Sequence, residues 1–276
     1  MSSPAPKKSL GQHWLDDEFS LEAMCEASAV QVGDTVLEIG PGPGALTKLL
    51  VQKADHVVAV EFDAHWAREL PKTISATNLE VQQQDILSFD FTSLPHNYKV
   101  IANIPYYLTS NLIRVLSETS NPPQSATILI QKEVAQRAAA KPGDMSLLSV
   151  TAQYYWQVEL GEEVPAELFI PPPKVDSQIL VLQYRTEPLF KNVDTKKFFH
   201  IVKAGFSQKR KTLLNSLSAG LQLDKATVQE VCDAAGIDSR RRAQTLSLDE
   251  WHALYSKINA WRVKSGRLRL AYGTNQ

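Results

Sequence analysis

The apolar residues of this chain follow two patterns, and the change from one to the other divides the chain into two parts. Between residues 35 and 131, short runs of consecutive apolar residues alternate with segments whose apolar residues recur every three or four positions. The runs are typical of buried strands, and the spaced segments are typical of amphipathic helices. This alternation predicts an α/β fold, in which crossover helices cover a parallel sheet.

The expected strands and helices follow one another along this first part. Strands are expected at residues 35–39, 56–60, 79–81, 99–102 and 126–130, and helices at residues 45–52, 64–70 and 108–116. Pro71 lies at the expected end of the second helix. Residues 147–158 and 179–184 are expected to be later strands of the same sheet. The prediction is therefore a mostly parallel sheet of seven strands.

The second part begins near Glu187 and Pro188. From Thr195 onward the apolar spacing is helical, and no strand pattern follows. We therefore expect two domains, an α/β domain over residues 1–187 and a small all-helical domain over residues 188–276.

The composition argues against several classes of protein. A hydrophobic content of 43% and a charged content of 21% are ordinary for a soluble globular protein. Cys25 and Cys232 lie far apart without neighbouring His or Cys, so neither a disulfide framework nor a metal site is expected. No stretch approaches the ~20 apolar residues of a membrane span, and residues 1–10 lack the apolar core of a signal peptide. A cytoplasmic protein is expected.

The charge is unevenly distributed, although the formal net charge is only −1. Residues 185–276 contain 17 Lys and Arg against 8 Asp and Glu, whereas residues 1–184 contain 12 against 22. A basic module on an acidic body can bind nucleic-acid phosphates. The alternative is that the charges lie on solvated helix faces. Two clusters concentrate the positive charge, Lys209-Arg210-Lys211 and Arg240-Arg241-Arg242.

A glycine-rich turn at residues 38–44 directly follows the first expected strand. Glu61 comes 21 residues after Gly40, the first glycine of the turn, and this spacing is typical of a site for an adenosine-containing cofactor. Gly40 and Gly42 let the backbone approach the ligand, and the acid at the end of the second strand can bind ribose hydroxyls. The same spacing also satisfies the nicotinamide-dinucleotide fingerprint.

Glu38 helps to separate these two cofactors. A carboxylate just before the first glycine would repel a pyrophosphate, and it would attract the ammonium and sulfonium groups of S-adenosylmethionine. Pro41 and Pro43 also remove two N–H groups that a phosphate would need. The turn therefore favours S-adenosylmethionine.

The next strand ends complete the expected cofactor site. Asp85, after the third strand, can accept a hydrogen bond from the adenine amino group, although a simple strand-end turn residue is the alternative. Phe62 and Ile86 are expected to sandwich that adenine. These residues follow parallel strands, and open α/β sheets bind ligands at the carboxyl ends of their strands.

Asn103-Ile104-Pro105-Tyr106 follows the fourth expected strand and indicates the chemistry. An amine conjugated to a flat ring is a poor nucleophile, because its lone pair is delocalised. The Asn103 side-chain oxygen and the Ile104 carbonyl could hold its two N–H groups and draw the nitrogen toward tetrahedral geometry. Pro105 keeps the turn rigid, and Tyr106 offers a face on which a base can stack. Taken alone, the tetrapeptide is equally compatible with an ordinary proline turn.

With these features the chain resembles the ribosomal RNA adenine N6-dimethyltransferase family of KsgA/RsmA type, from about Lys8 to beyond Arg242. The resemblance implies a Rossmann-like class I methyltransferase domain followed by a small helical domain. It also implies transfer of four methyl groups from S-adenosylmethionine to two adjacent adenines in the 3′-terminal hairpin of small-subunit (16S) rRNA, within a pre-30S particle. The markers are Gly11-Gln12-His13-Trp14-Leu15, residues 38–44 and 103–106, the proline-rich loop 169–177 and the basic helical motif 206–217.

The resemblance assigns roles to single residues. Tyr106 and Phe169 would clamp the flipped adenine from opposite sides. Lys174 would join the two basic clusters in contacting RNA. Two departures are present, since Trp14 stands where the family usually has Phe, and Met145-Ser146 where it often has Tyr-Gly. The implied cofactor contacts are His13, Leu15, Gly40, Glu61, Asp85 and Asn103.

Three other functions remain open at this point. A resistance-type methyltransferase acting on one adenine of large-subunit rRNA would share the fold and the chemistry. An assembly factor would keep the cofactor fold without needing turnover, and a dinucleotide oxidoreductase is disfavoured by Glu38. The proline-rich loop and residues 206–217 favour the small subunit, and a monomer is expected.

Overall fold

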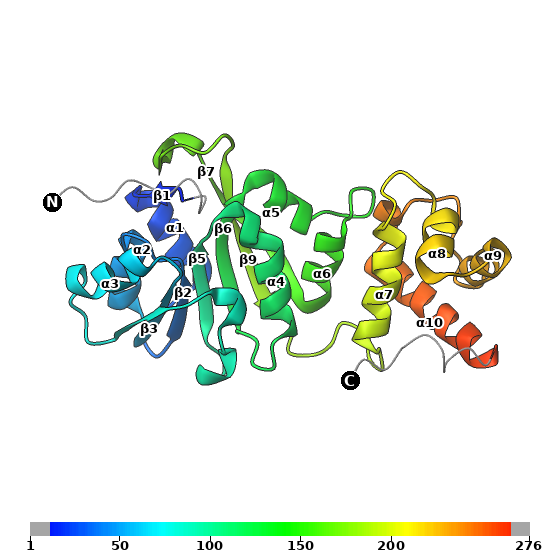
Figure 1. Ribbon diagram of the computed structural model, residues 1–276, viewed down its shortest axis with the longest axis horizontal. Coiled ribbons are helices and arrows are strands. Elements are labelled where there is room, and N and C mark those ends of the chain that lie inside the picture. Colours follow the sequence, from blue (N-terminus) through cyan, green and yellow to red (C-terminus); the bar gives the residue numbers. More distant parts are fainter. Residues whose placement is uncertain (1–11, 266–276) are drawn as a thin grey trace. The chain divides into compact units, whose positions relative to one another are not determined.

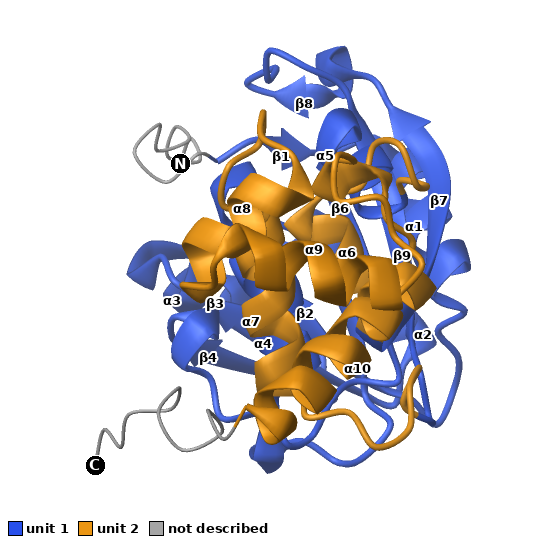
Figure 2. Ribbon diagram, turned by 90° about the vertical axis from the view of Figure 1, so that its right-hand side faces the viewer, with its two compact units in different colours: residues 1–139, 155–187 blue, residues 140–154, 188–276 orange. Residues whose placement is uncertain are grey.

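The computed structural model describes residues 12–265, which form two compact units (Figure 2). Unit 1 consists of residues 12–139 and 155–187, and unit 2 consists of residues 140–154 and 188–265. Gly11, the first residue of the N-terminal motif, lies outside the described residues, as does Lys8. The break at Glu187 and Pro188 lies where the sequence suggested it, but residues 140–154 belong with the helical unit.

A sheet of seven strands forms the centre of unit 1 (Figure 1), in the order β4-β3-β2-β5-β6-β9-β7. The first five of these pair in parallel, and β9 runs antiparallel to both of its neighbours. The inner strands are buried along almost their whole length, which is why they read as continuous apolar runs. The bounds are β2 Thr35–Ile39, β3 His56–Glu61, β4 Leu79–Gln83, β5 Lys99–Asn103, β6 Ser125–Gln131, β7 Trp156–Val164 and β9 Ser177–Tyr184.

Helices and short turns connect these strands. One core cluster joins α1 and α2 to one face of the sheet, through apolar residues such as Met24, Leu50 and Ile101. The helices of unit 1 are α1 Glu18–Ser28, α2 Ala45–Lys53, α3 Ala64–Thr73, α4 Thr109–Glu118 and α5 Lys132–Ala138, with 3-10 turns at Ile86–Ser88, Phe91–Ser93, Tyr106–Leu108 and Ala166–Leu168.

A second sheet of only two strands joins segments that are far apart in the chain. Trp14–Leu15 (β1) pairs antiparallel with Phe169–Ile170 (β8), so that Leu15 lies opposite Phe169. Both of these side chains are buried in the core of unit 1. The pairing therefore anchors the N-terminal motif to the proline-rich loop.

Unit 2 is helical. Gly205 lets α7 approach α10 closely, since a Cβ there would lie 2.4 Å from the ring of Trp251. Residues 140–154 join this unit because Tyr154 packs its ring against Phe198 and Phe199 of α7. The elements are α6 Leu147–Tyr155, α7 Thr195–Phe206, α8 Leu213–Leu221, α9 Lys225–Ala234, a 3-10 turn at Ala243–Thr245 and α10 Leu248–Lys264.

Two expectations about elements were wrong. Residues 147–158 are not one strand, because α6 occupies Leu147–Tyr155 and β7 begins only at Trp156. The Ser146 and Ser149 hydroxyls bond to each other's backbone amides, which is a local start signal for a helix. The second expected helix also continues through Pro71 to Thr73, and the loss of one amide donor is tolerated in its last turn.

Lys99 ties the start of β5 to the turn before β2. Its Nζ donates to the Ala29 carbonyl at 2.6 Å and to Asp34 Oδ2 at 2.8 Å, and its side chain is only 9% exposed. We expect Lys99→Ala to lower the free energy of unfolding by about 3 kcal/mol, because it leaves a poorly hydrated carboxylate without its partner. Lys72→Ala removes an exposed ion pair with Glu69 and should cost at most about 0.5 kcal/mol in the same denaturant titration. Equal effects of the two variants would contradict this assignment.

Candidate active site

A cavity of about 360 Å³ opens at the carboxyl edge of the sheet in unit 1. Its walls come from the glycine-rich turn, the ends of β3, β4 and β5, and the small β1–β8 sheet. Cavities of this size are typical of small-ligand sites. Every residue that the sequence analysis assigned to the cofactor or to catalysis lines this one cavity.

The glycine-rich turn forms one wall of the cavity. Gly40, Gly42 and Gly44 all have positive φ angles, which only glycine adopts without strain. The Gly40 amide donates to the Val60 carbonyl at 2.9 Å, and the Gly42 amide donates to Glu61 Oε2 at 3.0 Å. The Gly44 amide donates to the Pro41 carbonyl at 2.9 Å. Three amides of the turn are thus already bonded within the protein, which disfavours the pyrophosphate of a dinucleotide.

Glu61 is both a cavity residue and a support of the turn. Its Oε1 accepts from the Asp63 amide at 2.7 Å while its Oε2 holds Gly42. Burial raises its pKa, and the two backbone amides counteract part of that shift. Each carboxylate oxygen has a further lone pair, so these bonds leave acceptor capacity for a ligand hydroxyl.

Glu38 is the second carboxyl at the base of the turn. Only 1% of its surface is exposed, and its Oε2 has no hydrogen-bond partner among residues 12–265. Burial raises its pKa to about 8, the Thr47 hydroxyl lowers it and the charge of Glu61 raises it further. Two buried carboxyl groups beside one cavity favour a cationic ligand over an anionic one.

The residues expected at the adenine of the cofactor, Phe62, Asp85 and Ile86, also line the cavity. Asp85 is exposed, and its Oδ1 accepts from the Leu87 amide at 2.9 Å, which caps a short 3-10 turn. Phe62 presents a ring that is 61% exposed, whereas Ile86 is buried. Asp85 is thus a turn residue, as the simpler interpretation held, and it also lines the cavity.

Asn103 and Ile104 lie where β5 ends. In the part of the chain that the structure describes, neither the Asn103 side chain nor the Ile104 carbonyl makes a hydrogen bond. Pro105 and Tyr106 use their carbonyls within the turn, accepting from the Leu108 amide and the Thr109 hydroxyl. The two acceptors that the sequence analysis singled out are therefore available to a ligand.

Tyr106 is held by contacts on two sides. Its hydroxyl lies 2.8 Å from Ser177 Oγ, and the His13 ring stacks against its ring with centroids 6.0 Å apart. The His13 ring is fixed in turn by Nδ1, which donates to the Pro171 carbonyl at 2.7 Å. Phe169 lines the cavity but is only 1% exposed, so it forms part of the wall and offers no open face.

Ser177 and Pro171 also support the site, although no sequence pattern indicated this role for them. Both belong to the proline-rich loop that is one of the markers of the family resemblance, and their contacts to Tyr106 and His13 cross more than 70 positions of sequence. Trp14, the departure from the usual Phe, lies over the glycine-rich turn, with its Nε1 3.5 Å from where a Cβ on Gly42 would stand.

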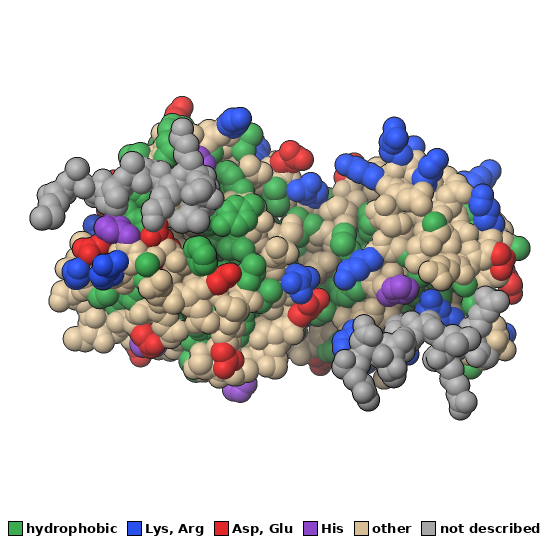
Figure 3. Space-filling model, viewed as in Figure 1, with side chains coloured by type: hydrophobic (Ala, Val, Ile, Leu, Met, Phe, Trp, Pro, Cys, Tyr) green, Lys and Arg blue, Asp and Glu red, His purple; other side chains and the backbone are tan. Residues whose placement is uncertain are grey.

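The two basic clusters lie side by side in unit 2. The Leu213 amide, just after Lys211, donates to the Arg241 carbonyl at 2.8 Å, and the Leu214 amide donates to Ser239. Lys209, Arg210 and Lys211 are exposed, as is Lys174 of unit 1. Figure 3 shows Lys and Arg side chains gathered along one edge of unit 2.

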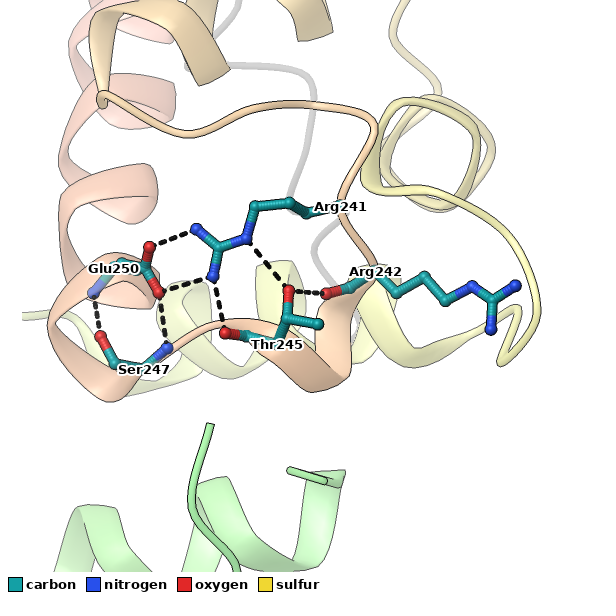
Figure 4. Close-up of polar contacts among 5 residues, drawn as sticks. All are labelled: Arg241, Arg242, Thr245, Ser247 and Glu250. Atoms are coloured by element: carbon teal, nitrogen blue, oxygen red, sulfur yellow. Dashed lines mark hydrogen bonds and ion pairs between the residues drawn. The ribbon is translucent and has the colours of Figure 1, made fainter. Parts of the chain in front are cut away.

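The three arginines of the second cluster differ in their contacts. Arg241 binds the Glu250 carboxylate and the Thr245 carbonyl, and Arg242 points away from that network (Figure 4). Arg240 is exposed and pairs with Asp238 at 3.0 Å. Arg241 therefore has a structural partner, whereas the exposed Arg242 presents its guanidinium outward.

Two negative findings apply to residues 12–265. None of the helices formed by these residues is long and apolar enough to cross a membrane. No group of three or more His, Cys, Asp or Glu side chains is arranged to hold a metal ion in the same range.

Comparison with known proteins adds independent information. Residues 5–259 match the family described as ribosomal RNA adenine dimethylase. The chain is 42% identical to ribosomal RNA small subunit methyltransferase A of Alkaliphilus metalliredigens over 263 residues, 92% of each chain. It is 43% identical to the protein of that name from Desulfitobacterium hafniense over 255 residues, 91% of each chain.

Solved structures of two related enzymes share the fold. A dimethyladenosine transferase from Plasmodium falciparum superposes with a TM-score of 0.76 and 26% identity, covering 90% of this chain and 98% of that one. The 23S rRNA methyltransferase ErmE superposes with a TM-score of 0.71 and 28% identity, covering 89% and 99%. A class I methyltransferase fold with an added helical unit is thus common to all three.

Proposed function

Because this chain belongs to the ribosomal RNA adenine dimethylase family, we propose that it dimethylates N6 of two adjacent adenines in the 3′-terminal hairpin of small-subunit rRNA. The observation that carries the proposal is a pair of acceptors, Asn103 Oδ1 and the Ile104 carbonyl, which make no hydrogen bond within residues 12–265 and lie with Tyr106 in one cavity. Two acceptors match the two hydrogens of an adenine amino group. The helical unit would bind the RNA within a partly assembled subunit.

The cavity fits S-adenosylmethionine as the methyl donor. Its buried carboxyl groups, Glu38 and Glu61, suit a ligand with cationic groups and ribose hydroxyls, and Glu38 has an oxygen without a partner among the described residues. When bound, this cofactor supplies the methyl group on a sulfonium. Phe62, Ile86 and Asp85 would hold its adenine, and His13, Leu15, Gly40 and Gly42 would enclose its methionine end.

The residues of this chain would act by orientation. Asn103 and Ile104 would accept both N6 hydrogens of the target adenine and direct the nitrogen lone pair toward the methyl group, at roughly 3–3.5 Å. The Tyr106 ring would stack on the base, and the hydrogen bond between its hydroxyl and Ser177 Oγ would fix the orientation of the ring. The cationic product nitrogen can lose its proton to water, so this mechanism needs no protein base.

The second methylation makes a different demand on the site. An adenine that already carries one methyl group offers a single N–H, so one of the two acceptors is left without a donor. The orientation of the base then depends more on stacking against Tyr106 and on the cavity wall at Phe169.

Methyl transfer to isolated ribosomal subunits tests the proposal. Labelled S-adenosylmethionine is incubated with undermethylated small subunits and, in parallel, with large subunits, and the nucleosides are analysed. Dimethyladenosine in the small subunit is expected. Product only in the large subunit would support the resistance-type alternative, and tight binding without any product would support an assembly factor.

We further propose that Lys209, Arg210, Lys211, Arg240 and Arg242 contact rRNA phosphates, with Lys174 as a contact from unit 1. Arg242→Ala should reduce the slope of log affinity against log salt by about one, since one phosphate contact releases about one counterion. Lys257→Ala, which removes an exposed charge outside both clusters, should leave the slope unchanged.

Arg241→Ala provides the contrasting case. We expect it to lower thermal stability, because it breaks the bonds to Glu250 and Thr245, while the salt slope changes less than in Arg242→Ala. A larger slope change in Arg241→Ala would show that this network opens when RNA binds.

A further inference from the structure

Tyr107 and Ile170 are exposed apolar side chains at the cavity that the mechanism above does not use. Tyr107 is 69% exposed and Ile170 is 59% exposed, and both line the cavity. The Tyr107 ring makes no ring contact with the rest of residues 12–265. Large apolar side chains that stay exposed beside a binding cavity are typical of a contact surface.

Their positions in the chain relate them to Tyr106 and Phe169, which line the proposed place of the reacting adenine. Tyr107 directly follows Tyr106 in the turn Tyr106–Leu108, and Ile170 directly follows Phe169 in β8. Tyr106 is half-buried and Phe169 is buried, whereas the residue after each is exposed. Neighbouring residues of a strand point to opposite faces, so β8 sends Phe169 into the core and Ile170 outward. The cavity is thus lined by an inner pair, Tyr106 and Phe169, and by an outer pair, Tyr107 and Ile170.

We propose that Tyr107 and Ile170, the outer pair, hold the base next to the adenine that is being methylated. This inference rests on the proposed function, because only a substrate with two adjacent target bases gives the outer pair a defined occupant. The outer pair would bind the second adenine, whereas the inner pair would bind the adenine that reacts.

Base flipping leaves the neighbouring adenine without one of its stacking partners. Extruding one adenine removes a stacking partner from its neighbour, which then exposes a bare face at a cost of a few kcal/mol. An aromatic ring at the cavity entrance can replace that partner, and such stacking does not require a particular hydrogen-bonding edge. The neighbouring adenine would then lie at the entrance when the first has been methylated.

The experiment combines protein variants with altered RNA. Undermethylated small subunits are prepared with both adenines, or with either one replaced by uridine, whose smaller ring stacks less. Formation of dimethyladenosine is measured for wild type and for Tyr107→Ala, Ile170→Ala and Tyr107→Phe. Phe19→Ala is the matched control, since Phe19 is 77% exposed but does not line the cavity.

On subunits with both adenines, Tyr107→Ala is expected to lower kcat/KM roughly five- to tenfold, mainly by raising KM. A loss of this size corresponds to the lower end of the range measured for removing the stacking of one base. Ile170→Ala is expected to give a smaller loss in the same sense. On the uridine-substituted subunits the Tyr107→Ala loss should shrink to about twofold or less, and Tyr107→Phe should behave as wild type on all substrates.

The outcomes separate this inference from the proposed function. A Tyr107→Ala loss that is the same with and without the neighbouring adenine would overturn the inference, as would no loss beyond that of Phe19→Ala. Wild-type protein that forms no dimethyladenosine on any subunit would overturn the proposed function itself, and the inference with it.

Discussion

Asn103→Ala should lower kcat for adenine dimethylation by about 100- to 1000-fold. Removing one preorganised hydrogen-bonding group at a reacting centre typically costs this much. The Asn103 oxygen would accept from the N6 amino group, and the Ile104 carbonyl alone cannot orient that nitrogen. The measurement is a single-turnover assay with undermethylated small subunits, which separates the chemical step from product release.

Asn103→Ala should leave the rest of the protein intact. Asn103 is half-buried and its side chain makes no hydrogen bond with residues 12–265, so the midpoint of thermal unfolding should change little. Binding of small subunits should also persist, because the proposed RNA contacts lie mainly in unit 2. A variant that keeps a chemical rate within a few-fold of wild type would exclude Asn103 from the catalytic role.

Glu38→Gln should weaken the binding of S-adenosylmethionine about tenfold at pH 8, because an amide cannot ionise to balance the cationic end of the cofactor as the carboxyl of Glu38 can. S-adenosylhomocysteine lacks the sulfonium charge and should lose less affinity. Isothermal titration of both ligands against wild type and Glu38→Gln measures the difference. Equal losses for the two ligands would show that Glu38 does not sense the sulfonium.

The pH dependence of binding follows from the same group. Burial raises the pKa of Glu38 from 4.5 to about 8, so the ligand-free protein holds a proton there at neutral pH. A cation that prefers the ionised carboxylate must displace that proton. Affinity for S-adenosylmethionine should therefore rise as the pH increases from 6 to 8, and the rise should be smaller in Glu38→Gln.

The free energy of unfolding should fall as the pH rises, in contrast to the affinity for S-adenosylmethionine, which should increase. Between pH 4.5 and about 8 the folded protein binds a proton at Glu38 that the unfolded chain has already lost, so the free energy of unfolding falls as the pH rises through this window. Burial raises the pKa of Glu61 as well, which adds to the same trend. Denaturant titrations at several pH values should show a shallower fall in Glu38→Gln than in wild type.

Much of the α/β unit was predictable because its signals are local. Short stretches rich in apolar residues mark most of the parallel strands, and Gly40, Glu61, Asp85 and Asn103 lie at or just after the ends of β2, β3, β4 and β5. Parallel strands bring their carboxyl ends to one edge of a sheet, so the order of these residues already implied that they share a cavity.

The expectation of a strand at residues 147–158 failed for a related reason. Eight of the twelve residues from Leu147 to Val158 are apolar, and in a short segment of this kind periodicity alone does not distinguish a buried strand from a buried helix. Leu147–Tyr155 is a helix that packs Tyr154 among aromatic side chains of α7, and only the residues from Trp156 onward pair with β9. Those partners lie elsewhere in the chain, and packing against them decided the outcome.

Patterns of neighbouring residues were enough to predict the alternation of strands and helices, the chemistry at the strand ends and the uneven charge, since each depends on residues close together in the chain. Which functional groups are free to act became known from the folded chain alone. In the fold, β1 pairs with β8 and Phe169 is buried. The Asn103 side chain has no hydrogen-bond partner among residues 12–265, and Glu250 forms an ion pair with Arg241 and not with Arg242. Burial and hydrogen bonding depend on contacts between distant segments, and these form only when the chain is packed.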